Sequence, residues 1–170
     1  MNQILAPPVS RADLERYANR LRRQLGVEND LRIPVLSLVE ERIGLLLDGT
    51  FNYEYVDISK LPGEYAHYNP QENLLTIRED VYMRASAGVG RDRFTIAHEI
   101  GHFCLHSDNM VLSRATPGQE IPAYRDPEWQ ANTFASYFMM PRHLIAGMSA
   151  KEVSECCGTS LQAAAIALKQ

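Results

Sequence analysis

Two histidines and a glutamate near the middle of the chain have the spacing of a metal-dependent hydrolase. The segment reads His98-Glu99-Ile100-Gly101-His102, an H-E-x-x-H motif. Residues four apart lie one turn apart on the same face of a helix, so both imidazoles can reach one metal ion. Glu99 would then lie beside the ion, where it can take a proton from water and pass it to a leaving amine. The spacing predicts His98 and His102 as metal ligands and Glu99 as the catalytic acid and base.

A third metal ligand must come from another segment, because a hydrolytic zinc site has three protein ligands and one open position. We predict Glu128, which begins a second apolar helix that would pack against the motif helix. Asn132, one turn further along, is placed to hydrogen-bond a ligand imidazole. His106 is a rival ligand, but three histidines on one straight helix span about 12 Å, too far for one ion, so we expect it to pack or to orient its neighbours. Zn²⁺ suits this mixed site, with Mn²⁺ as the alternative.

The group that would stabilise a transition-state oxyanion is not identified by any spacing. Hydrolysis of a peptide usually needs a donor aimed at the developing negative charge. Four side chains have the right chemistry, namely Tyr65, His67, Tyr68 and Tyr124. Tyrosines in such segments mostly serve packing, so the role is assigned to none of the four.

The elements that must position these residues are predicted from periodicity, caps and turn signals. A helix is expected from Ser10 to Leu25, ending at Gly26, and aromatic and β-branched residues between Phe51 and Ile77 favour antiparallel strands. Further helices are expected at residues 35–42, 91–106, 127–140, 141–148, 149–157 and 160–169, and the beginning of a strand at 44–48. The predicted fold class is α+β, with a small antiparallel or mixed sheet packed against a helical bundle that contains the H-E-x-x-H helix.

Length and composition predict a single domain that spans residues 1–170, with a C-terminal helical tail at about 141–170, and the H-E-x-x-H motif makes this domain metallopeptidase-like. Apolar residues make up 45% of the 170 and charged residues 22%, as in globular domains. The net charge of -4, from 21 acidic and 17 basic side chains, argues against direct binding of nucleic acid. Residues 149–169, read as a DNA-binding helix-turn-helix, offer only Lys151 and Lys169 as bases.

The expected location is the cytoplasm. The N-terminus lacks a signal peptide, and no run approaches the roughly 18 apolar residues of a membrane span. The three cysteines, Cys104, Cys156 and Cys157, have no zinc-finger spacing and suit a reducing compartment as free thiols.

The chain resembles the ImmA/IrrE family of metallopeptidases in three stretches. These are Arg93-Phe94-Thr95-Ile96-Ala97-His98-Glu99-Ile100-Gly101-His102, Glu128-x-x-Ala131-Asn132-x-Phe134-Ala135 and Met140-Pro141. The resemblance implies the same roles for His98, Glu99, His102 and Glu128 as the spacing does. It also implies a bacterial, phage or mobile-element protein that cleaves or antagonises a helix-turn-helix repressor of the Xre type, often encoded beside it.

The sequence therefore predicts two alternative functions. The first is a zinc-dependent endopeptidase that cleaves a specific protein partner, with the strand near Leu74 to Ile77 pairing with an extended substrate segment. The second is a binding module, such as the toxin of a toxin–antitoxin pair, that sequesters a repressor without cutting it. The intact Glu99 favours the enzyme. In both, the partner is a DNA-binding protein encoded nearby, with no direct contact to nucleic acid or membrane.

Overall fold

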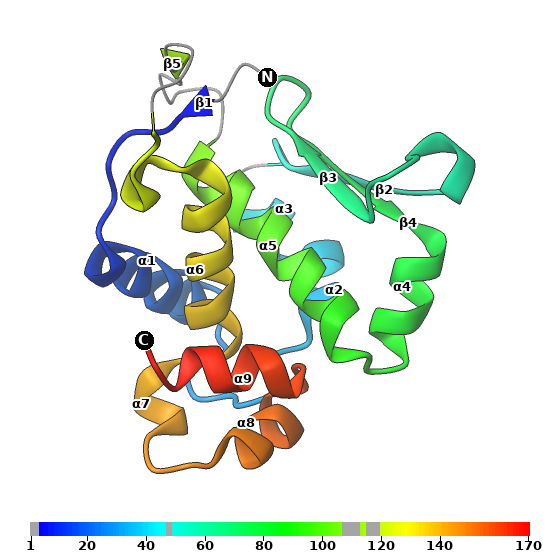
Figure 1. Cartoon of the computed structure of the whole chain (residues 1–170). Helices are drawn as coiled ribbons and strands as arrows, with labels where there is room; N and C mark the ends of the chain where they lie inside the picture. The colour runs from blue at the N-terminus through cyan, green and yellow to red at the C-terminus, as the bar shows by residue number, and fades with distance from the viewer. Residues whose placement is uncertain (1–3, 47–48, 107–112, 115–119) are drawn as a thin grey trace.

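A computed structural model describes residues 4–46, 49–106, 113–114 and 120–170 (Figure 1). The longer helices are α1 (Arg11–Gln24), α4 (Glu79–Ser86), α5 (Gly90–His106), α6 (Pro127–Met139), α8 (Ala150–Cys157) and α9 (Leu161–Ala167). Shorter helical pieces are α2 (Val35–Ser37), the π-helix η1 (Leu38–Ile43), α3 (Gly44–Leu46), the 3₁₀ turns η2 (Ile58–Lys60) and η3 (Ala123–Arg125), and α7 (Arg142–Ile145). The strands are β1 (Ile4–Leu5), β2 (Asn52–Val56), β3 (Ala66–Asn69), β4 (Leu74–Arg78) and β5 (Ser113–Arg114).

Helix starts follow from local capping chemistry. The Ser10 side chain accepts a hydrogen bond from the amide of Asp13 at the start of α1. Ser149 and Glu152 form the reciprocal capping box that begins α8. The Asp126 side chain accepts from the amide of Glu128, so the first turn of α6 is fixed at the residue predicted to bind metal. The helices expected at residues 10–25, 91–106 and 127–140 are confirmed to within a few residues.

The strand expected to begin at residues 44–48 is wrong, and one helix was not expected. Gly44–Leu46, expected to begin a strand, continues the helical segment as α3, while Leu47 and Asp48 lie outside the described residues. Leu45 and Leu46 are 81% and 42% exposed, so they lack the burial that a core strand needs. Helix α4, between the sheet and the motif helix, was not expected at all.

The main sheet is mixed, which is one of the two alternatives, antiparallel or mixed, in the predicted fold class. Its strand order is β2-β4-β3, with β2 parallel to β4 and β3 antiparallel to β4. The fully antiparallel arrangement expected between Phe51 and Ile77 is therefore wrong for β2, because turn signals show where the chain reverses and not which strand it then joins. A second, two-stranded antiparallel sheet pairs β1 with β5.

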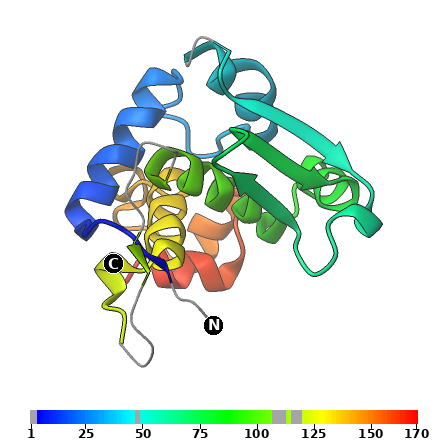
Figure 2. The same ribbon diagram turned by 90° about the horizontal axis from the view of Figure 1, so that it is seen from above.

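Helix α5 lies between the main sheet and α6, and α1 packs against α6 on the far side (Figures 1 and 2). Ile96 and Ile100 of α5 and Phe134 and Phe138 of α6 are fully buried where these layers meet. The fold is thus the α+β arrangement expected from the sequence, with the H-E-x-x-H helix at its centre. Among the helices of the described residues, none has the length and apolar character needed to cross a membrane.

Candidate metal centre

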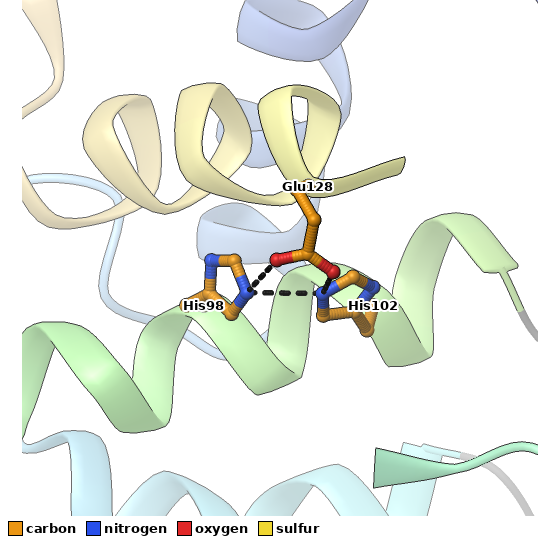
Figure 3. Close-up of side chains that lie close together, drawn as sticks. All are labelled: His98, His102 and Glu128. Atoms are coloured by element: carbon orange, nitrogen blue, oxygen red, sulfur yellow. Dashed lines mark hydrogen bonds and ion pairs between the residues drawn. The ribbon is translucent and has the colours of Figure 1, made fainter. Parts of the chain in front are cut away.

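Helix α5 carries both predicted histidine ligands on one face. The Nε2 atoms of His98 and His102 lie 2.9 Å apart, as expected for side chains separated by one helical turn (Figure 3). The two rings meet edge to face, with centroids 4.6 Å apart. Both imidazoles therefore present the same nitrogen to one point in space.

The carboxylate of Glu128 reaches that point from α6. Its Oε2 lies 3.3 Å from Nε2 of His98, and its Oε1 lies 3.2 Å from Nε2 of His102 (Figure 3). Ligands about 2.0–2.2 Å from a tetrahedral ion lie about 3.3 Å from one another. The three donors, at 2.9, 3.2 and 3.3 Å, are close enough together to surround one metal ion. His98, His102 and Glu128 are also the group that the described residues offer as a candidate metal site.

Gly101, inside the motif, permits the approach of α6 that brings Glu128 to the histidines. A Cβ added at Gly101 would lie 3.0 Å from the carbonyl oxygen and 3.2 Å from the Cα of Ala131, and 3.3 Å from Cδ1 of Phe134. These contacts are tighter than ordinary van der Waals packing, and two of them involve backbone that cannot rotate away. The glycine therefore sets the distance between the two ligand-bearing helices.

Charge at the site is arranged around Glu128. Hydrogen bonds with His102 and His98 hold the pKa of the Glu128 carboxyl well below its usual range, so this group is ionised. Burial works to lower the pKa of His98, but its contacts with Glu128, Glu99 and Asn132 outweigh that effect and raise it. An ionised carboxylate beside two imidazoles is a donor set that can bind a divalent metal ion.

The carboxylate of Glu99 is buried beside the ligands and held from the opposite side by the sheet. Its Oε2 accepts a hydrogen bond of 2.9 Å from the backbone amide of Tyr68 in β3. Its Oε1 lies 4.0 Å from Nε2 of His98. Burial raises the pKa of the Glu99 carboxyl, which strengthens it as a base. Glu99 is thus adjacent to the ligand cluster without belonging to it.

Each ligand histidine has a hydrogen-bonding partner at its other ring nitrogen. Nδ1 of His98 lies 3.1 Å from Oδ1 of Asn132, the contact expected from the spacing of α6. Nδ1 of His102 lies 3.0 Å from Nδ1 of His106, whose Nε2 lies 2.8 Å from Oε1 of Gln130. His106 therefore contacts a candidate ligand histidine, and the role in packing or orientation expected for it stays a prediction at this point. Gln130 was missed because a single glutamine in a helix has no distinguishing spacing.

A cavity of about 470 Å³ opens in front of these groups. It is lined by Thr95, His98, Glu99 and His102 of α5, by Glu128 of α6, and by residues 64–68 leading into and along β3. Three of the four candidates for oxyanion stabilisation, Tyr65, His67 and Tyr68, are among the lining residues, while Tyr124 is not. The Tyr68 hydroxyl is engaged with Oδ1 of Asn73 at 2.6 Å, and Nδ1 of His67 pairs with Glu64 at 3.2 Å.

The fold and the candidate site define a metallopeptidase-type domain, in which a helix supplies two imidazoles and an adjacent carboxylate and a second helix supplies an acidic ligand. A family model described as the IrrE N-terminal-like domain, Peptidase_M78, matches residues 55–157. The chain belongs to this family, which confirms the resemblance seen in its sequence.

Among solved structures, one described as a Mycobacterium tuberculosis transcriptional regulator has a similar fold, with a TM-score of 0.54 and 17% sequence identity. The similarity covers 90% of this chain and 45% of that one, so the chain spans less than half the length of this structural neighbour. A search of curated proteins finds no match.

Proposed function

We propose that this protein is a zinc-dependent endopeptidase that cleaves a specific protein partner. The observation that carries the proposal is the position of Glu99: a buried carboxylate with a raised pKa, next to three metal-ligand atoms and at the wall of an open cavity. A site that only retained a structural metal would need no base at this position, and structural zinc sites are closed by four ligands.

In the proposed reaction His98, His102 and Glu128 hold the ion. Bound Zn²⁺ would polarise the scissile carbonyl and make the attacking water more acidic. The amide of Tyr68 occupies Oε2 of Glu99 and so leaves Oε1, the oxygen nearer His98, to take the proton and return it to the leaving amine.

The substrate would lie along β3, the edge strand of the sheet. The sequence-based expectation that Leu74 to Ile77 pairs with substrate is wrong, because β4 is hydrogen-bonded on both sides. Amides alternate in direction along a strand, and the Tyr68 amide points to α5, so the amide of Ala66 points to the cavity side as well. An extended peptide added at this edge would run between β3 and the metal ligands.

The proposed substrate is a DNA-binding repressor of the helix-turn-helix, Xre type, encoded near this protein and met in the cytoplasm. Membership of the IrrE-like family supports a regulatory protein as partner, and the structural neighbour is itself described as a transcriptional regulator. The acidic net charge of -4 favours a protein partner over DNA.

The test is capture from the native host with the Glu99→Gln variant, which keeps the size and hydrogen bonding of the side chain and removes the base. The expected result is a repressor that co-purifies full length with the variant and is cut by the wild type. If the partner stays full length with the wild type while its target promoter is still released, the protein works by sequestration and the endopeptidase proposal fails.

A further inference from the structure

We propose that His106 and Gln130 form a hydrogen-bond relay that positions the metal ligand His102, fixing its proton on Nδ1 and directing the lone pair of Nε2 at the ion. The proposal rests on the proposed metal site and adds two positioning residues to it. Both side chains are buried, with His106 5% and Gln130 1% exposed. Their polar atoms must therefore find partners inside the protein.

The orientation of the Gln130 carboxamide is fixed by two backbone carbonyls. Its Nε2 donates to the carbonyl oxygens of Pro7 and Tyr124, each at 2.8 Å. An amide nitrogen has two hydrogens, and both are used by these bonds. Oε1 of Gln130 is therefore left as an acceptor facing Nε2 of His106 at 2.8 Å.

The orientation of Gln130 determines where the imidazole protons lie. Because Oε1 of Gln130 can only accept, Nε2 of His106 carries a hydrogen and its Nδ1 is an acceptor. Nδ1 of His102, 3.0 Å away, must then be the donor. A neutral imidazole with its proton on Nδ1 has its lone pair on Nε2, the atom that lies 3.2 Å from Glu128 and 2.9 Å from its counterpart in His98.

The far end of the relay is anchored where two segments of backbone are joined. The amide of Ala6 donates to the carbonyl of Arg125 at 2.9 Å, and the amide of Val9 donates to that of Tyr124 at 3.0 Å. The Gln130 side chain bonds a carbonyl from each of these segments. The relay thus ties His102 to a cross-linked part of the backbone, whereas His98 is oriented directly by Asn132 at the solvent-exposed side of the site.

The relay is tested by two substitutions at His106 and one matched control. His106→Leu removes the acceptor for His102, whereas His106→Asn keeps an oxygen near the place of Nδ1. Leu105→Ala removes a neighbouring buried side chain of the same helix that lies outside the hydrogen-bonded chain. For each purified protein we would measure the dissociation constant for Zn²⁺ by competition with a chromophoric chelator, the absorption spectrum with Co²⁺, and the melting temperature without metal.

The expected result is that His106→Leu weakens Zn²⁺ binding by about 10- to 100-fold and alters the Co²⁺ spectrum, as loss of a hydrogen bond to a ligand histidine does elsewhere. His106→Asn should restore most of that affinity. Leu105→Ala should lower the metal-free melting temperature and leave the Zn²⁺ affinity unchanged.

Two outcomes would overturn the relay. In the first, His106→Leu and Leu105→Ala lose similar stability and bind Zn²⁺ equally tightly. His106 would then be a packing residue. In the second, His106→Asn and His106→Leu weaken Zn²⁺ binding equally. A hydrogen-bond acceptor at this position would then not matter for metal binding. A wild type that binds neither ion would instead refute the proposed metal site itself, so the two failures are distinguishable.

Discussion

The two walls of the cavity differ in which groups they present: side-chain donors on one wall and an edge strand with a backbone amide on the other. The helical wall, from α5 and α6, presents His98, His102 and Glu128, and each ligand histidine has its second nitrogen hydrogen-bonded to another side chain. The sheet wall, along β3, presents Tyr65 and His67 as exposed side chains and uses a backbone amide to hold Glu99.

Under the proposed function, the helical wall would hold the metal ion and the sheet wall would bind the substrate backbone. A metal site requires donors placed within a fraction of an ångström, which hydrogen-bonded side chains on packed helices can supply even where, as for Glu128, the side chain is exposed. A peptide substrate has a repeating backbone, and an edge strand can hydrogen-bond this backbone whatever side chains the peptide and the strand carry. The helical wall should therefore tolerate few substitutions, and the sheet wall more.

The largest effect is expected for His102→Ala on the helical wall. The wild type should hold one divalent ion per chain and this variant none, because the remaining donors no longer surround the ion. Elemental analysis after gel filtration measures the metal content per chain, and Glu128→Ala, which should also lose its metal, is measured in parallel. The sheet-wall variant His67→Ala is the control and should keep its metal, and equal metal content in all the proteins would refute the ligand assignment.

Glu99→Gln should separate metal binding from turnover. Cleavage of the captured partner should fall by roughly 10²-fold or more, because the proton acceptor is lost, while metal content stays at the wild-type level. The measurement is a time course of partner cleavage on a gel at equal metal loading. Undiminished cleavage would show that Glu99 is not the base.

Gly101→Ala should damage the helical wall without removing any ligand. The added Cβ would meet the backbone of Ala131 at 3.0 and 3.2 Å, so α6 must move and carry Glu128 with it. Overpacking of this kind costs about 1–3 kcal/mol in the free energy of unfolding, and weaker Zn²⁺ binding should accompany it. Urea denaturation of the metal-free protein and chelator competition measure the two effects.

Gly44→Ala is the matched control for this substitution. Gly44 is also helical, with φ near -60°, but its Cβ would meet only the carbonyl of Phe51, at the ordinary distance of 3.7 Å. Alanine is favoured over glycine in a helix by up to about 1 kcal/mol, so this variant should be as stable as the wild type or more so. If both variants behave alike, close packing at Gly101 does not position α6.

The smallest effect is expected for Ala66→Pro on the sheet wall. Proline removes the backbone N–H of residue 66, which would donate a hydrogen bond to the substrate. Because this N–H points away from β4, the β3–β4 ladder should persist. Loss of one hydrogen bond is worth about 0.5–1.5 kcal/mol, so KM for the partner should rise about 2- to 10-fold with kcat and metal content little changed. His67→Pro, which removes an amide that faces β4, should destabilise the sheet instead, and an unchanged KM for Ala66→Pro would argue against pairing at this edge.

The features that could be predicted from the amino-acid sequence are those that depend on neighbours along the chain. The His98, Glu99 and His102 spacing predicts a shared helical face because the α-helical period is a local property. The capping residues at Ser10, and at Ser149 with Glu152, predicted helix starts that the structure confirms, since a cap bonds amides only two or three residues away.

The features that join segments distant in sequence became visible in the folded chain alone. Three features depend on how separate elements pack: Gln130 behind His106, the Tyr68 amide on Glu99, and the position of β3, and not β4, at an edge of the sheet. Turn signals and hydrophobic periodicity carry no information on which strands pair or which amide faces a carboxylate. The two histidine ligands were thus predictable from local spacing. The place of Glu128 beside them, the orientation of the imidazoles and the proposed path for substrate depend on the packed fold, because they are set by contacts between segments distant in sequence.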